Sequence, residues 1–124
     1  MNFLFKNGKK IKPNRVVIFG KSGIISTNLQ KKLKVAKCKY VVIGKSKIDL
    51  TKKNSNIRLS KIIKEEDSIV FISAEAPVKN LKMKNKNYMM CKNICQVLKN
   101  KSINHLIYIS SDAVYSDSSK KIFE

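Results

Sequence analysis

Four short runs of consecutive apolar residues stand out along the chain, and each is rich in β-branched or aromatic side chains. They are VVIF (16–19), YVVI (40–43), IVFI (69–72) and LIYI (106–109). Unbroken rather than alternating hydrophobicity is typical of a strand covered on both faces, as in a parallel sheet between helices. The four runs therefore predict strands of a parallel sheet.

The segments between these runs have helical spacing. GIISTNLQKKL places Ile25, Leu29 and Leu33 four residues apart, which predicts a helix with one apolar stripe and polar residues turned to water. RLSKIIKE predicts a shorter helix, and NYMMCKNICQVLKN a longer one with the stripe Tyr88, Cys91, Ile94, Cys95 and Leu98. Strands alternating with helices indicate the α/β class. We expect a doubly wound parallel sheet.

Composition limits the kinds of protein that this chain can be. Its 124 residues suffice for one domain, and 43% apolar residues suffice for a packed core. The 27 Lys and Arg against 8 Asp and Glu give a net charge of +19, which favours association with polyanions. The lysines are scattered, however, without the interleaved aromatic residues of single-strand binders, so nucleic acid is the less favoured partner.

The cysteines and the apolar segments bear on compartment. Cys38, Cys91 and Cys95, with His105 as the only histidine, do not supply four ligands at zinc spacing, so no metal site is predicted. We expect reduced, buried thiols. No segment approaches the ~18 apolar residues of a membrane span, and the first apolar run is too short for a signal peptide. The expected location is the cytoplasm, with no membrane partner.

A glycine-containing turn follows the first predicted strand. In GKSGIIS, Gly20, Gly23 and Ser26 are spaced as G-x-x-G-x-x-S at the start of the first predicted helix. Glycine permits the tight turn and the close approach of backbone N–H groups to a pyrophosphate at the helix N-terminus. A glycine pair that merely caps the helix is the alternative.

The second predicted strand ends in IGKSKIDLT. NAD-binding folds often place an acid at this end for the ribose hydroxyls, whereas a cation or hydroxyl suits a 2'-phosphate. Lys45 and Ser46 occupy the position. The sequence thus favours NADP slightly over NAD as cofactor, unless Lys45 is only one more surface lysine.

Taken in order, VVIFGKSGIISTNL, DLT, DSIVFISAEAP and NYMMCKNICQVLKNKSINHLIYISSDAVY resemble the extended short-chain dehydrogenase/reductase family. These are NAD(P)-dependent epimerases and dehydratases that act mostly on nucleotide-linked sugars. The resemblance covers residues 15–116 and implies a Rossmann-type doubly wound parallel sheet, truncated after the fifth strand. Its most specific part is Asn87, twenty-three residues before Ser110, as in the family's Asn-helix-strand-Ser-Ser pattern.

The resemblance implies a cofactor site built from three segments. The first loop would hold the pyrophosphate through Gly20, Ser22, Gly23, Ile24 and Ile25. The acid-aliphatic pair Asp49 and Leu50 would contact the adenine. The end of the third strand and the next helix would line the nicotinamide ribose through Ser73, Ala74, Ala76 and Asn87.

The resemblance also implies a substrate-binding hydroxyl. Ser111 matches the Ser or Thr that hydrogen-bonds the reacting hydroxyl or carbonyl of the sugar; the alternative is a Ser that only satisfies loop backbone groups. Asp112 follows, as an Asp does in similar dehydratases, but Ala113 stands where those enzymes have Glu. An incomplete acid/base pair disfavours a dehydratase and favours a reductase or epimerase.

Three departures from the family pattern stand out. Ser26 replaces the third glycine and is expected to crowd the helix against the first strand. Glu75 stands where a small or neutral residue is usual and would repel a phosphate unless it points outward. The family's catalytic Tyr, with a Lys four residues later, lies on a helix beyond the Ser loop. The sequence ends at Glu124, and Tyr115 has no Lys at that spacing, so this pair is expected to be missing.

The predicted function follows from these observations. Residues 1–14 would be a basic arm and 15–124 an incomplete NAD(P)-binding Rossmann domain of an epimerase or reductase acting on nucleotide-linked sugars, without turnover by itself. A non-catalytic nucleotide-binding or assembly module is the alternative, and a basic nucleic-acid binder is less favoured. The LIYI strand is expected to be an exposed edge, open to a partner chain or to self-association.

Overall fold

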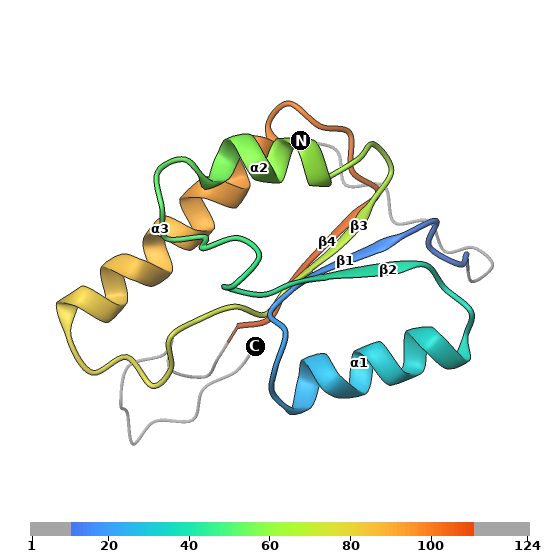
Figure 1. The fold of residues 1–124 in the computed structure, drawn as a ribbon, viewed down its shortest axis with the longest axis horizontal. Helices are drawn as coiled ribbons and strands as arrows, with labels where there is room; N and C mark the ends of the chain where they lie inside the picture. The colour runs from blue at the N-terminus through green and yellow to red at the C-terminus, as the bar shows by residue number, and fades with distance from the viewer. Residues whose placement is uncertain (1–10, 111–124) are drawn as a thin grey trace, which may run out of the picture.

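The computed structural model describes residues 11–110, which form a parallel sheet between helices (Figure 1). Its strands are β1 (Val16–Phe19), β2 (Tyr40–Ile43), β3 (Ser68–Phe71) and β4 (His105–Tyr108). Its helices are α1 (Ile24–Val35), α2 (Ser55–Ile62) and α3 (Leu81–Leu98). The spatial order of the strands is β2-β1-β3-β4.

All strand pairs are parallel. β1 pairs with both β2 and β3, with Phe19 opposite Ile43 on one side and Phe71 on the other. β4 extends the sheet in the same register, with Tyr108 opposite Phe71. The carboxyl ends of all four strands therefore lie at one edge of the sheet. The predicted Rossmann-type α/β fold class is confirmed.

The strand count differs from the expectation. The described residues contain four strands, one fewer than the five expected, and each corresponds to one of the four apolar runs. Between β2 and β3 the chain forms turns over residues 50–54 and then α2. Each described strand uses one of the four apolar runs, and a strand buried on both faces needs such a run, so the described residues have none left for a fifth.

The helices cover both faces of the sheet. Figure 1 shows α1 on one side and α2 with α3 on the other. On the α2/α3 side the core is built around Val17, Phe19 and Ile69 of the strands and Leu59 and Ile94 of the helices. A smaller core on the α1 side gathers Val16, Ile18, Cys38 and Val70, against which Leu29 and Leu33 pack. This two-sided burial is what the unbroken apolar runs required.

The buried stripe of α1 differs from the predicted one by a single residue. Leu29 and Leu33 pack on the sheet as expected, but Ile25 is 51% exposed and Ser26 is completely buried in its place. Spacing of four residues drifts around a helix of 3.6 residues per turn, so the first member of the stripe leaves the interface.

The α3 stripe is corrected in two places. The helix begins at Leu81, earlier than expected, because the side chain of Asn80 accepts a hydrogen bond of 2.9 Å from the backbone N–H of Met83. Ile94 is buried as predicted, whereas Tyr88 is 64% exposed. Cys95 is also exposed, although buried thiols were expected. The buried face instead includes Met90, Asn93 and Val97.

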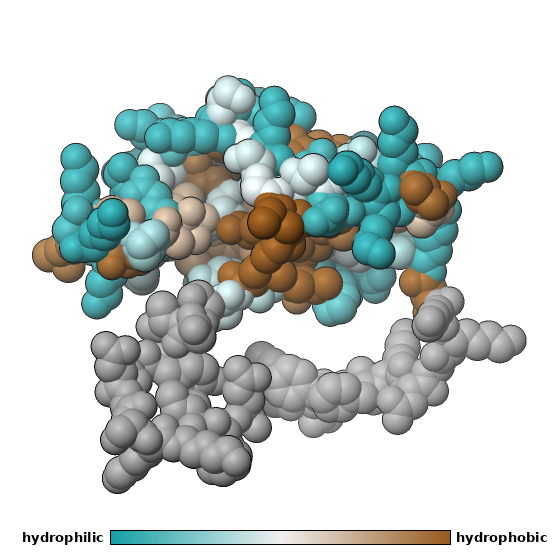
Figure 2. Space-filling view, turned by 90° about the horizontal axis from the view of Figure 1, so that it is seen from below, coloured by the Kyte–Doolittle hydropathy of each residue, from teal (hydrophilic) through white to brown (hydrophobic). Residues whose placement is uncertain are grey.

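β4 is an edge strand in the described part of the chain, as predicted. It pairs with β3 and presents apolar side chains to solvent, with Leu106 43% and Tyr108 55% exposed. The Tyr108 ring lies 5.5 Å from that of Phe71, centroid to centroid. Figure 2, seen from the α1 side, shows further hydrophobic side chains gathered near the middle of that face. Among residues 11–110, no helix combines the length and hydrophobicity that crossing a bilayer requires.

An ion pair joins the amino ends of β1 and β3. The Arg15 guanidinium donates to both carboxylate oxygens of Asp67, at 2.8 and 2.5 Å, and also to the carbonyl of Ile62 at 2.7 Å. The Asp67 carboxylate accepts a further bond from the Lys64 backbone N–H at 2.7 Å. Burial by itself would raise the pKa of Asp67. The hydrogen bonds from Arg15 and Lys64 and the charge of Arg15 outweigh burial and lower that pKa below its ordinary value.

This lowered pKa predicts a pH dependence of stability. The stabilisation is present above the ordinary carboxyl pKa of about 3.9 and is lost as the pH falls through the lower folded value. We expect Asp67→Asn to lower the free energy of unfolding at pH 7 by about 3 kcal/mol, because it leaves a partly buried guanidinium without its counter-charge. Urea unfolding at pH 7, 5 and 3 measures both effects. The control is Glu66→Gln at an exposed carboxylate; equal acid sensitivity of Asp67→Asn and wild type would contradict the assignment.

Candidate cofactor-binding site

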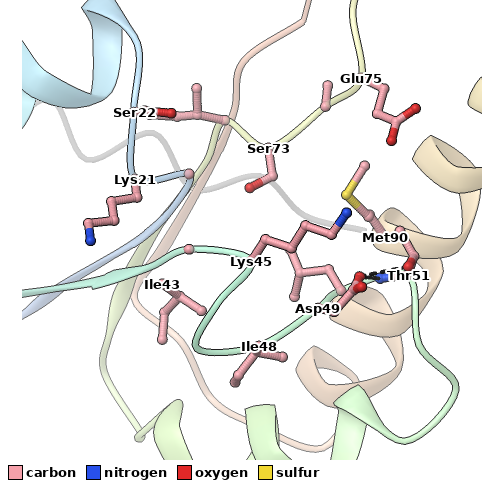
Figure 3. Close-up of a pocket in the computed structure, with 15 residues that line it drawn as sticks. Lys21, Ser22, Ile43, Lys45, Ile48, Asp49, Thr51, Ser73, Glu75 and Met90 are labelled. Carbon is pink, nitrogen blue, oxygen red and sulfur yellow. Dashed lines mark hydrogen bonds between the residues drawn. The ribbon is translucent and has the colours of Figure 1, made fainter.

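A cavity of about 300 Å³ opens at the carboxyl ends of β1, β2 and β3 (Figure 3). This volume is at the lower limit of small-molecule sites, and the position is where doubly wound sheets bind ligands. The lining residues are Gly20, Lys21, Ser22, Ile43, Gly44, Lys45, Ile48, Asp49, Leu50, Thr51, Ile72, Ser73, Ala74, Glu75 and Met90.

The loop after β1 turns sharply because Gly20 has a φ of +125°. Its N–H donates to the Ile43 carbonyl at 3.0 Å, so the hydrogen bonds between β1 and β2 continue into the loop. A Cβ on Gly20 would lie 3.2 Å from Ile72 Cβ and 3.4 Å from Ser73 N. Only glycine therefore fits both the backbone conformation and the space beside β3.

The loop after β2 carries a cation into the cavity. The N–H groups of Lys47 and Ile48 both donate to the Gly44 carbonyl at 3.0 Å, which closes a tight turn. Figure 3 shows the side chain of Lys45 extending across the cavity, whereas Lys21 points away from it. Ser46, the other residue predicted at this turn, is exposed and does not line the cavity.

Asp49 is held in place by the residue two positions later. Its Oδ1 accepts hydrogen bonds from the backbone N–H of Thr51 at 3.0 Å and from the Thr51 hydroxyl at 2.6 Å. The Thr51 hydroxyl, more than any other group, lowers the pKa of Asp49, and the charges of Lys45 and Lys52 act in the same direction. The site therefore contains an ionised, oriented carboxylate with acceptor capacity to spare.

The segment after β3 is fastened to α3. The Asn87 amide donates to the Glu75 carbonyl at 2.9 Å, and its oxygen accepts from the Glu75 N–H at 2.7 Å. The Glu75 carboxylate pairs with Lys86 at 3.0 Å. The carboxylate that was expected to repel a phosphate thus lies beside a compensating cation.

Ser26 is accommodated rather than crowded. It is completely buried, and its hydroxyl donates a short hydrogen bond to the Gly20 carbonyl. The hydroxyl therefore supplies a hydrogen bond in exchange for the space that was predicted to crowd the helix against the first strand.

The predicted cofactor residues fall into two groups. Those that line the cavity are Gly20, Ser22, Lys45, Asp49, Leu50, Ser73 and Ala74. Those outside its lining are Gly23, Ile24, Ile25, Ser46, Ala76 and Asn87. The roles assigned to both groups stay predictions. Ser111 and Asp112 lie outside the described residues.

Sequence reasoning missed several contributors. Ile48 and Met90 supply apolar walls, and Thr51 orients Asp49. A signal was present for Met90, since it lies three residues after Asn87 and therefore on a neighbouring part of the same helix face. Tyr88 and Lys92 have the spacing of a Tyr-x-x-x-Lys pair. They lie on α3, before the Ser loop, and neither lines the cavity.

The chain matches a model of a known protein family. A family model described as NAD dependent epimerase/dehydratase family matches residues 16–124. The chain belongs to this NAD dependent epimerase/dehydratase family. The match spans every strand and helix of the described structure, and it confirms the family resemblance predicted from the sequence. A search of curated proteins gives no match to the chain.

Solved structures share the epimerase/dehydratase fold. A GDP-L-fucose synthetase from Naegleria fowleri bound to NADP superposes with a TM-score of 0.78 at 14% identity, covering 93% of this chain and 36% of that one. A second structure of a GDP-L-fucose synthetase from the same organism gives 0.80 at 15% identity, covering 97% and 38%. The chain thus spans little more than a third of the length of these proteins, and the likeness is one of fold.

The glycine turn predicts unequal effects of two alanine substitutions. At Gly23, which has φ +100° and ψ 166°, an added Cβ meets no atom within 4 Å, so Gly23→Ala tests backbone strain without a clash. At Gly20 strain and contact with Ile72 combine. We expect Gly20→Ala to destabilise the chain by about 1 kcal/mol more than Gly23→Ala. Urea unfolding of both variants measures the difference, and equal losses would contradict the proposed close approach to β3.

Proposed function

We propose that the cavity binds the adenine half of NAD(P), and that the chain is the NAD(P)-binding portion of an epimerase or reductase acting on nucleotide-linked sugars. The observation that carries this proposal is the convergence of three loops on one cavity. These are the glycine turn after β1, the Lys45 and Asp49 loop after β2, and the Ser73 segment after β3. Membership of the epimerase/dehydratase family supports it.

The arrangement of charges favours the phosphorylated cofactor. Lys45 lines the cavity, and Figure 3 shows its positively charged side chain extending across it. Of the two carboxylates, Glu75 is paired with Lys86. Asp49 keeps acceptor capacity for ribose or adenine donors. We infer NADP as the preferred cofactor, with Lys45 contacting the 2'-phosphate; one solved structure of similar fold is described as bound to NADP.

The cofactor preference is tested by one substitution. We expect Lys45→Ala to raise the Kd for NADP+ about tenfold, because the 2'-phosphate loses a charge-assisted contact, and to leave the Kd for NAD+ within about twofold. Isothermal titration calorimetry at low and high salt measures both values, and the difference should shrink as salt rises. Lys47→Ala, in the same turn but outside the cavity, is the matched control. Equal weakening for both cofactors would exclude a 2'-phosphate contact.

The catalytic step is a separate proposal. Parent enzymes of this kind would move a hydride between the nicotinamide and a sugar carbon, with Ser111 holding the sugar. The 124-residue chain has no Tyr-x-x-x-Lys pair after Ser111. We expect NADPH binding but no oxidation of NADPH when nucleotide sugars are added, monitored by absorbance at the nicotinamide band. Turnover would contradict the expectation that the chain lacks its proton-transfer pair, and it would also exclude a purely non-catalytic binding module.

A further inference from the structure

The loop after β1 is tied to α1 by two polar side chains, Ser26, which stands where the family has its third glycine, and Gln30. The buried Ser26 hydroxyl donates to the Gly20 carbonyl. The Gln30 amide nitrogen, one turn further along α1, donates to the Ser26 hydroxyl at 3.1 Å and to the Lys21 carbonyl at 3.2 Å. Both hydrogens of one amide group are thus used, one on the loop carbonyl of Lys21 and one on the Ser26 hydroxyl that itself bonds the loop.

These bonds fix the orientation of two peptide groups, the one between Gly20 and Lys21 and the one between Lys21 and Ser22. In a planar trans peptide, the carbonyl of one residue and the N–H of the next point in opposite directions. With the Gly20 carbonyl turned to Ser26, the Lys21 N–H points away from it. With the Lys21 carbonyl turned to Gln30, the Ser22 N–H likewise points away. Lys21 and Ser22 both line the cavity, and their N–H groups have no acceptor among residues 11–110.

We propose that Ser26 and Gln30 are positioning residues that orient the N–H groups of Lys21 and Ser22 toward the pyrophosphate of the bound cofactor. Neither side chain lines the cavity, so both act through the loop backbone. A third glycine would allow close packing of α1 against the loop. Ser26 provides a hydrogen bond to the loop instead, and Gln30 adds a second one. This inference rests on the proposed nucleotide function.

The test compares ligands with and without a pyrophosphate. In the full 124-residue chain, we expect Gln30→Met to raise the Kd for NADP+ and for ADP-ribose about fivefold, because the loop donors lose their fixed orientation. The Kd for 2'-AMP, which has no pyrophosphate, should stay within about twofold, as measured by NMR titration. Gln96→Met, at an exposed position on α3, is the matched control and should change none of the three.

A second variant tests whether the two side chains act as one unit. We expect Ser26→Gly to weaken binding of the pyrophosphate ligands as Gln30→Met does. The double variant should bind hardly more weakly than either single one, since the bond from Gln30 to the Ser26 hydroxyl joins the two side chains in one hydrogen-bond network. Ser26→Gly also keeps the test open if Gln30→Met does not fold by circular dichroism.

The outcomes separate the two proposals. Equal weakening of all three ligands, or no change in any, overturns the positioning role while leaving the nucleotide site in place. If the wild-type chain binds none of the three compounds, the nucleotide function is wrong and the positioning role is wrong with it. Selective loss of NADP+ and ADP-ribose affinity supports both.

Discussion

Everything at the site depends on β1 being paired with a parallel strand on each side. Val17, Ile18 and Phe19 are completely buried, so the strand offers polar chemistry only where it ends. The backbone hydrogen bonds continue past that end: the N–H groups of Ile72 and Ser73 both donate to the Phe19 carbonyl, at 2.8 and 2.9 Å. Three loops are therefore held at one edge before any side chain contributes, which gives a small domain a rigid place for a ligand.

The two edges of the sheet have different roles. At the amino edge the partly buried pair of Arg15 and Asp67 joins β1 to β3, so these charges satisfy each other. At the carboxyl edge two asparagines of α3 hold the loops. Asn87 bonds both backbone groups of Glu75, and the Asn93 amide donates to the Leu50 carbonyl at 2.7 Å. Amides suit this task because they satisfy backbone groups without introducing a charge near a phosphate.

Sequence reasoning located the strands to within one residue, because a strand buried on both faces must be apolar throughout and such runs are rare in a lysine-rich chain. It was less accurate for the helices. Tyr88 is exposed and Asn93 is buried, which is the reverse of the burial expected for an aromatic and a polar residue. Their positions depend on the angle at which α3 lies on the sheet and on the loop carbonyls that Asn93 meets, neither of which a hydrophobic pattern contains.

By itself, the sequence determined the α/β class, the parallel strands, the glycine turn and the family, since each depends on residue type at local spacing. Only the tertiary structure decided that Lys45 reaches across the cavity, that Lys86 lies beside Glu75, and that Gln30 reaches the loop carbonyls. The physical reason is that direction and distance between side chains of separate segments follow from how those segments pack. Packing brings together residues whose separation along the sequence does not predict that they are in contact.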